Sequence, residues 1–460
     1  MKKLNGRDLL ALGFMTLALF LGAGNIIYPP LFGLQQGENT WYFACGFLVT
    51  AVGLPVLTIV ALARVNGTIQ VLSHPIGQFC SVLFAVTCYL AVGPLFATPR
   101  TATVSYEIGI QPFLPDSLTM SRWPLAIYSL CYFLVTMVVS FYPGRLLDTV
   151  GKFLAPVKVI AILFLGASAF IAGAYLIQPE HVNTENINAF SVVSSGISNG
   201  YLTMDTLGAL VFGIVIVRAI QSRGVTDEGL VTRYAIMAGL MAGLGLAVIY
   251  IMLFRLGLDS RYIAAGADTG AKVLSIYVNH IFGIVGNFIL AFLIIIACLV
   301  TSVGLTCACS EYFGRLLNKS EKLLTVILVI FSMIVSNLGL KELIKFSEPL
   351  LYGLGPICVV LVLLSLGNNF WHSRRLVIVP GMIVALLFGI AQALRTIDWS
   401  APIFSGTWFS SLPSILKSVL GEWPLYDHKL EWVLPIAFVA VVSIVIDAVL
   451  RYRSKRSEIR

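Results

Sequence analysis

Two glycines and an asparagine stand within four residues near the middle of a long apolar stretch, at Gly22, Gly24 and Asn25. Each glycine costs a helix about 1 kcal/mol relative to alanine, so this cluster predicts a break in a membrane helix. A break frees carbonyl groups at the end of the first half-helix and amide groups at the start of the second. Carbonyl oxygens suit Na⁺, and amides suit a carboxylate. The alternative is that the glycines only let a neighbouring helix approach closely.

A second irregular stretch favours the first interpretation. The apolar window that begins near Asn199 is short, contains the ionisable Asp205 and carries Gly208 and Gly213. An unbroken membrane helix satisfies its own backbone hydrogen bonds and offers little to a polar ligand. Interruptions at matching places in two halves of a chain are typical of inverted-repeat transporters, which bind their substrate between the broken helices. We therefore predict a binding site between residues 22–25 and a gap around 205–208.

A third element is a pair of adjacent hydroxyls at Thr301 and Ser302 in a later apolar window. Hydroxyl oxygens, together with carbonyls from an unwound helix, can coordinate a small hard cation without adding fixed charge. The alternative is that each hydroxyl bonds the carbonyl four residues earlier, as is common in membrane helices. From these two residues alone, the alternative is the better interpretation.

The main ionisable residues within apolar windows are Arg100, Asp205 and Glu348. Charged groups at membrane depth are costly and usually functional. We expect these three to form a structural or gating salt bridge rather than to contact a substrate directly. The alternative is that some lie near helix ends and reach the membrane interface.

The elements that position these residues follow from composition. Of 460 residues, 58% are apolar and 11% are charged, and the mean hydropathy is +0.92, whereas soluble proteins have about 25% charged residues. Such a chain cannot cover itself with polar groups, so we predict an all-α polytopic membrane protein in a lipid bilayer. Twelve apolar windows predict twelve transmembrane helices: 9–36, 41–63, 76–106, 124–144, 153–177, 199–217, 231–254, 282–310, 323–339, 347–367, 376–394 and 432–450.

The windows group into two sets of five followed by two more. We expect residues 1–177 to form the first five-helix repeat, 198–367 the second, inverted repeat, and 368–460 helices 11 and 12 with a C-terminal tail. With both termini in the cytoplasm, most of the 30 Lys and Arg residues lie inside, as membrane proteins favour. The net charge of +8 is therefore a topology signal and does not indicate nucleic-acid binding.

Several classes of chemistry lack their motifs. The sequence has no GxxxxGK[ST] phosphate loop and no HExxH zinc motif. A GxSxG string at Gly196–Gly200 precedes a membrane span, whereas a nucleophile elbow needs a strand, a turn and a helix. The eight cysteines form no CxxC pair, and they are interpreted as buried apolar thiols, with disulfide or metal chemistry as the alternative. We predict neither an enzyme nor a cofactor.

Long strings of this sequence resemble those of the bacterial branched-chain amino acid:cation symporters, the LIV-II carriers. The resemblance covers essentially the whole chain and is weaker only at the termini and near 395–431. The strings that carry it are Gly13–Thr16, Gly22–Pro30, Val92–Ala102, Tyr142–Asp148 and Gly200–Ala209. It implies inward transport of leucine, isoleucine and valine coupled to Na⁺ or H⁺, across the bacterial cytoplasmic membrane. It also implies the five-plus-five fold of the amino acid–polyamine–organocation superfamily, with helices 1 and 6 discontinuous.

The resemblance also implies two sets of site residues. The carbonyl or hydroxyl oxygens of five residues would bind Na⁺: Ala18, Leu21, Cys298, Thr301 and Ser302. Six residues would surround the amino acid: Phe20, Ala23, Gly24, Asn25, Thr206 and Gly208. Within this second set, the amides of Ala23 and Gly24 would hold the carboxylate, and the Phe20 carbonyl and Thr206 would face the ammonium group.

The sequence thus predicts a secondary active symporter of branched-chain amino acids. One methylene group is worth about 1–3 kcal/mol of discrimination, so leucine, isoleucine and valine should compete with modest preferences. The alternatives are another sodium-coupled carrier of small amino acids with the same fold, and an ion channel. A channel would need rings of polar residues around a pore, and no such pattern is evident. The oligomeric state is not predicted.

Overall fold

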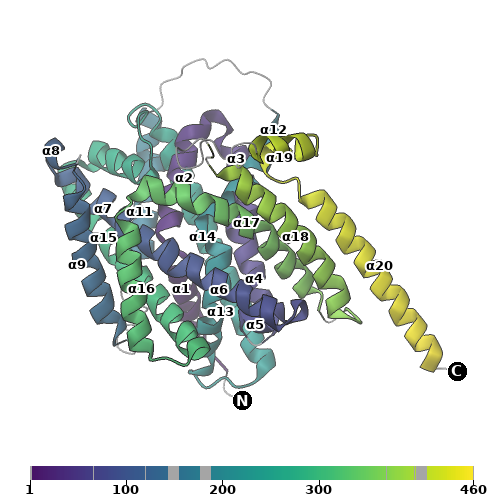
Figure 1. The fold of residues 1–460 in the computed structure, drawn as a ribbon. Coiled ribbons are helices and arrows are strands. Elements are labelled where there is room, and N and C mark those ends of the chain that lie inside the picture. The colour runs from purple at the N-terminus through teal and green to yellow at the C-terminus, as the bar shows by residue number, and fades with distance from the viewer. Residues whose placement is uncertain are drawn as a thin grey trace.

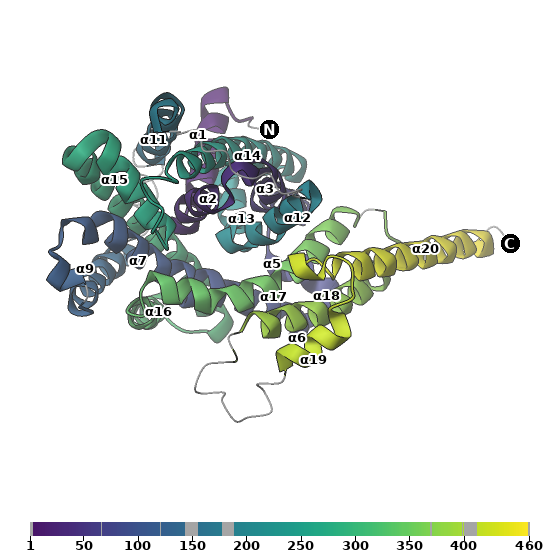
Figure 2. The same cartoon turned by 90° about the horizontal axis from the view of Figure 1, so that it is seen from above.

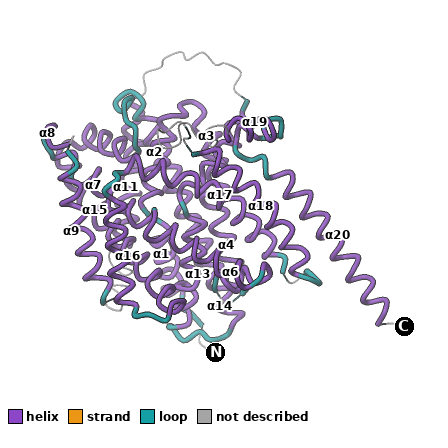
Figure 3. Tube along the Cα trace, in the orientation of Figure 1, coloured by secondary structure: helices purple, strands orange, loops and turns teal. Residues whose placement is uncertain are grey.

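The computed structural model describes residues 3–65, 67–119, 121–142, 155–176, 188–368, 370–397, 399 and 412–458. This part of the chain is built from helices, turns and loops and contains no strand (Figures 1 and 3). Residues 143–148 of the string Tyr142–Asp148, the window ends 143–144 and 153–154, and the boundary at residue 177 lie outside the described residues.

The helices of the first half follow the predicted windows. In chain order they are α1 (Gly6–Phe20), α2 (Ala23–Gln36), α3 (Thr40–Leu48), the π-helix η2 (Val49–Gly53), α4 (Leu54–Ala63), α5 (Ile69–Ser73), α6 (Gln78–Leu90), the π-helix η4 (Ala91–Leu95), α7 (Ala97–Gly109), α8 (Asp116–Thr119), α9 (Trp123–Ser140) and α11 (Ala155–Leu176). Proline and glycine bend the third window at η4, where Gly93 has non-helical angles and Pro94 follows it.

The second half continues in the same way. Its helices are α12 (Ala189–Asn199), the 3₁₀-helix η7 (Gly200–Thr203), α13 (Asp205–Gln221), α14 (Glu228–Asp259), α15 (Gly270–Leu317), α16 (Glu321–Ser336), α17 (Leu340–Leu366), α18 (Arg374–Thr396), α19 (Leu412–Leu420) and α20 (Val433–Glu458). Two stretches between the predicted windows, where we expect polar loops, contain helix instead. The stretch 178–198 contains most of α12, and the stretch 255–281 contains the end of α14 and the start of α15, which is kinked at Gly283.

The described part of each of the twelve predicted windows is mostly helical. By length and composition alone, eight helices of the described residues could cross a membrane, or nine if the bent pair α12–α13 is one span. This smaller number has a simple origin. Helices α1 and α16 are short, with 15 and 16 residues, the apolar part of α11 is Val159–Ile171, and α13 forms a span only together with α12.

The helices around α14 pack through close backbone contacts. A Cβ added to Gly257 of α14 would lie 2.1 Å from the Pro30 carbonyl oxygen of α2, and one added to Gly196 of α12 would lie 2.1 Å from the Phe43 oxygen of α3. Small residues at such contacts let membrane helices approach closely. From above, α2, α13 and α14 lie near one another, and α20 projects from the periphery (Figure 2).

The outward faces are apolar. Large side chains such as Phe292, Phe438 and Ile171 are more than 60% exposed, and only 17% of the apolar window in α20 is buried. Exposed apolar surface on this scale is stable only where it meets lipid or another protein. The start of α1 and the end of α20 lie on the same, lower side of the molecule in Figure 1.

Candidate substrate and ion site

The first helix is broken at the edge of the predicted stretch 22–25, because only Gly22 of that stretch lies outside a helix. Helix α1 ends at Phe20 and α2 begins at Ala23, with Leu21 and Gly22 between them. The Gly22 backbone is extended (φ −88°, ψ −173°). Its amide donates to the Phe20 carbonyl (2.7 Å) and to the Asn25 side-chain oxygen (2.9 Å). The break is thus held by a local turn and by one side chain of the next half-helix.

The second break has a different form. Helix α12 tightens into η7, Met204 adopts a left-handed conformation (φ 64°, ψ 12°), and α13 starts at Asp205. The two helices meet at a bend of 43°. The gap expected around 205–208 is therefore misplaced, because Gly208 lies in α13 and its amide donates to the Met204 carbonyl (2.8 Å). The chain departs from the helix at Met204 instead.

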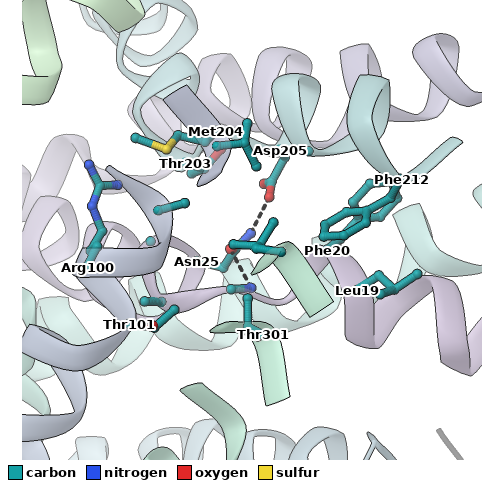
Figure 4. Close-up of a pocket in the computed structure, with 17 residues that line it drawn as sticks. Leu19, Phe20, Asn25, Arg100, Thr101, Thr203, Met204, Asp205, Phe212 and Thr301 are labelled. Carbon is teal, nitrogen blue, oxygen red and sulfur yellow. Dashed lines mark hydrogen bonds between the residues drawn. The ribbon is translucent and has the colours of Figure 1, made fainter. Parts of the chain in front are cut away.

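A buried carboxylate joins the two breaks. Asp205 accepts from the Asn25 side-chain amide of α2 (2.6 Å) and from the Tyr250 hydroxyl of α14 (2.5 Å), and Asn25 also contacts that hydroxyl. All three side chains are at most 4% exposed. Because Gly22 fixes the Asn25 oxygen, the Asn25 nitrogen must point toward Asp205 (Figure 4).

A cavity of about 40 Å³ lies between the two breaks. Small-molecule sites typically measure about 300–1,000 Å³, so the side chains that line this cavity must move apart before a small molecule enters. Apolar side chains line much of it: Leu19, Phe20, Val92, Met204, Phe212 and Leu305. Its polar lining comes from the breaks, Thr101, Thr203 and Thr301, and its charged lining residues are Arg100 and Asp205. Such a cavity suits a small molecule with an apolar body and polar ends.

The predicted substrate residues reach this cavity with one exception. Phe20, Ala23, Gly24, Asn25 and Gly208 line it. Thr206 is buried in the first turn of α13 but is not among the lining residues. Their role in binding a substrate remains a prediction.

The predicted cation residues are more dispersed. Thr301 lines the cavity, and a Cβ added to Gly22 would lie 3.9 Å from its methyl group. Its hydroxyl donates to the Ala297 carbonyl (3.1 Å), which is the alternative that the sequence left open. Ser302 points elsewhere, with its hydroxyl 3.5 Å from that of Thr136 on α9. The other three members do not line the cavity: Ala18, Leu21 and Cys298.

The expected salt bridge is not formed in this structure. Arg100 is 2% exposed and donates to the Leu202 carbonyl (3.2 Å) and the Ser347 hydroxyl (2.8 Å). Glu348 follows Ser347 on α17, and no ion pair joins any two of Arg100, Asp205 and Glu348. The hydroxyl and carbonyl acceptors take the place of a carboxylate, so the guanidinium positions the end of η7 instead.

The residues around Lys429, between α19 and α20, pack near the C-terminal end of α12. The Lys429 ammonium lies 3.6 Å from the ring centre of Tyr352, whose hydroxyl donates to Asn199 at the end of α12 (3.1 Å). Burial lowers the pKa of Lys429 to about 8, and the charge of Glu348 opposes this shift. The segment therefore links α20 to the helix that leads into the second break.

Tyr250 is the site residue that sequence reasoning missed. It lies inside the apolar window 231–254, where a single tyrosine usually packs or anchors at the interface. Its hydroxyl is the only part that distinguishes it from a packing residue, and the partner of that hydroxyl is Asp205, 45 positions away. No local pattern could have identified the pair.

Sequence comparison identifies the family. Residues 5–450 match the family of branched-chain amino acid transport proteins. The chain belongs to this family. It is 53% identical to the branched-chain amino acid transport system 3 carrier protein of Pseudomonas aeruginosa over 97% of both chains. It is 52% identical to a branched-chain amino acid permease of Escherichia coli K12, also over 97% of both chains. The predicted resemblance is confirmed, and this family member is a transporter rather than an enzyme.

Solved structures support the fold. A mutant of the Eremococcus coleocola manganese transporter matches with a TM-score of 0.57 at 13% identity, over 97% of each chain. Mhp1, a nucleobase-cation-symport-1 family transporter, matches with a TM-score of 0.53 at 13% identity, over 88% of this chain and 96% of that one. At this identity the likeness concerns the fold alone. This branched-chain amino acid transport family member is therefore a polytopic helical membrane transporter, as predicted.

Proposed function

We propose that this protein imports leucine, isoleucine and valine by cation symport with alternating access. The names of its relatives support the substrate class. The observation that carries the proposal is the cavity at two facing helix breaks, with an apolar lining and one charge of each sign. The amides at the start of α2 would take the carboxylate, and side chains such as Phe20 and Phe212 would enclose the branched carbons.

The coupling cation would bind beside the first break. Thr301 lies there, and the carbonyls of Ala18 and Leu21 at the end of α1 are the predicted further ligands. A cation drives transport only if it binds the substrate-competent state more tightly than the other state. Binding at the carbonyl end of α1 meets this condition, because it would hold the break in the geometry that the amino acid needs.

Alternating access would follow from the two predicted repeats, 1–177 and 198–367, moving around the site, with 368–460 at the periphery. We place the protein in the bacterial cytoplasmic membrane with both termini in the cytoplasm. The peripheral position of α20 and the shared side of α1's start and α20's end are consistent with this arrangement.

The test is uptake of labelled leucine into proteoliposomes. An inward Na⁺ gradient should drive saturable accumulation above the external concentration, and an equal K⁺ gradient should not. A proton gradient applied without Na⁺ separates the two candidate ions. Downhill flux that ignores every gradient would contradict symport and point to a channel. Stronger competition by alanine or glycine than by isoleucine and valine would identify another amino acid carrier of this fold.

A further inference from the structure

Asp205 is a buried carboxylate without a cationic partner among the described residues. It is 4% exposed, and no Lys, Arg or His side chain of the described chain pairs with it within 4.0 Å. Its hydrogen bonds come from neutral donors, among them Asn25 and Tyr250. An ionised carboxylate that is buried without an opposite charge is costly, and ionisable groups at membrane depth usually serve function. An ionised Asp205 is therefore matched best by one positive charge from outside the protein.

The Asp205 carboxylate is placed so that a cation in the cavity can reach it. Asp205 lines the cavity as the first residue of α13. Asn25 and Tyr250 each donate to one of its oxygens, and the Thr203 side chain lies close enough to interact with the carboxylate as well. A carboxylate has about four acceptor positions, so the Asp205 carboxylate can still accept another hydrogen bond. Asn25 and Tyr250 fix the orientation in which it does so. Figure 4 shows the carboxylate between residues of both breaks.

Other acceptors for a cationic group are less suited. Thr206 does not line the cavity, and the Phe20 carbonyl, which accepts from the Gly22 amide at 2.7 Å, carries no formal charge to match an ammonium group. Across the cavity, an Arg100 guanidinium nitrogen lies 3.3 Å from where a Cβ of Gly24 would be. A second nitrogen of this guanidinium group, Nε, has no partner among the described residues. The positive charge thus stands beside the amides of α2, and the negative charge stands at the start of α13.

We infer that Asp205 binds the α-ammonium group of the transported amino acid, in place of the predicted pair of Phe20 and Thr206. This inference rests on the proposed function. Binding of the ammonium group by Asp205 would make the protein selective for amines. A molecule with the same carbon skeleton and carboxylate but no ammonium group would leave Asp205 unpaired. Sites built around a buried polar group reject analogues that lack its partner far more strongly than an apolar pocket rejects a missing methylene.

The experiment compares leucine with 4-methylpentanoate, which lacks the ammonium group. Ligand-induced thermal stabilisation of the purified protein in lipid nanodiscs gives a half-saturating concentration for each compound directly. Wild type should prefer leucine by about 100-fold or more. Asp205→Asn, which is nearly isosteric, should bind leucine no better than wild type binds 4-methylpentanoate. Its affinity for 4-methylpentanoate should change by less than about threefold.

Asp447→Asn is the matched control. Asp447 is 2% exposed and caps α18 by accepting the amides of His372 and Ser373 (2.8 and 2.7 Å), outside the cavity. The same substitution there should leave the leucine preference intact. Asp205→Asn with an unchanged preference and altered Na⁺ dependence would overturn the inference and assign Asp205 to the coupling ion.

Wild type alone can still overturn the inference if Asp205→Asn does not fold. Equal stabilisation by leucine and 4-methylpentanoate overturns the inference while leaving the proposed function in place. The proposed function itself would be contradicted by a different result: no branched-chain amino acid stabilises the wild-type protein, and the protein carries none of them into liposomes.

Discussion

The two helix breaks face one cavity but are made in different ways. Between α1 and α2 the chain is simply extended at Gly22, in a region of backbone angles that any residue can adopt. Between η7 and α13 the chain turns at Met204, whose φ of 64° is unusual for a residue with a side chain. The first break thus stores little backbone strain, whereas the second holds a strained residue in place.

The surroundings explain how each break persists. The first is fixed locally, because the Asn25 side chain bonds the Gly22 amide three residues earlier. The second is fixed by distant elements, because Arg100 of α7 holds the Leu202 carbonyl and Tyr250 of α14 holds Asp205. Strained residues persist only where their surroundings over-determine them. Movement of α7 or α14 should therefore be felt first at the second break.

Gly24→Val tests whether the two breaks must touch. A Cβ at Gly24 would lie 3.2 Å from the Thr203 carbonyl oxygen and 3.3 Å from the Arg100 guanidinium group, and the branched side chain of valine adds two further atoms. Overpacking of this kind costs about 1–3 kcal/mol. We expect the half-saturating leucine concentration for uptake to rise by about 10- to 100-fold, with the protein still folded in membranes.

Gly304→Val on α15 is the control for Gly24→Val, since a Cβ there meets nothing within 4 Å. It should change the half-saturating leucine concentration by less than about threefold, an effect below 1 kcal/mol. If Gly24→Val takes up leucine with the half-saturating concentration of wild type, close contact between the two breaks is not needed for leucine binding.

Met204→Val tests the strain at the second break. A β-branched residue at positive φ is a steric outlier, so this variant should be less stable than Met204→Leu by about 2 kcal/mol. Leucine is the proper reference, because it has nearly the volume of methionine and no branch at Cβ. Reversible unfolding in mixed micelles measures the difference. Equal stabilities would show that the backbone at residue 204 relaxes readily, which would remove the contrast with Gly22.

The fold could be predicted from the sequence because its signal is local. A membrane helix needs only a long enough apolar run, and the described part of all twelve windows is mostly helical. The break at 21–22 could be predicted for the same reason, since glycines weaken a helix wherever they occur. The helix α12 escaped detection because its segment, with serines, glycine and asparagine, is too polar to look like a membrane span.

The rest of the site depends on contacts between distant residues. No local sequence pattern predicts a left-handed backbone at Met204, because the packing of η7 and α13 imposes that conformation. Thr301 and Ser302 form one sequence pair, yet adjacent helical residues point about 100° apart. Only Thr301 therefore lines the cavity. The Ser347 partner of Arg100, 247 residues away, is equally invisible to local patterns.

Thr301→Ala tests whether the cation belongs to the first break. Loss of one ligand or hydrogen bond is worth about 1 kcal/mol, so the Na⁺ concentration for half-maximal uptake should rise by about 5- to 10-fold. Ser302→Ala should also raise it, but by less, because its hydroxyl faces Thr136. The control is Thr325→Ala on α16, whose hydroxyl likewise donates to the carbonyl four residues earlier. If Thr301→Ala and Ser302→Ala both leave the Na⁺ dependence of uptake unchanged, the prediction of a cation site at α15 is wrong.

Gly22→Ala should have the smallest effect and separates backbone freedom from packing. The Gly22 angles suit alanine, and the added Cβ would lie 3.3 Å from the Asn25 side-chain oxygen, which must shift slightly. We expect the half-saturating leucine concentration to rise by about threefold, equivalent to under 1 kcal/mol, with uptake otherwise preserved. If Gly22→Ala were as harmful as Gly24→Val, the first break would need a glycine backbone after all. The strain we assign to Met204 would then not distinguish the two breaks, because both would depend on backbone conformations that side chains disfavour.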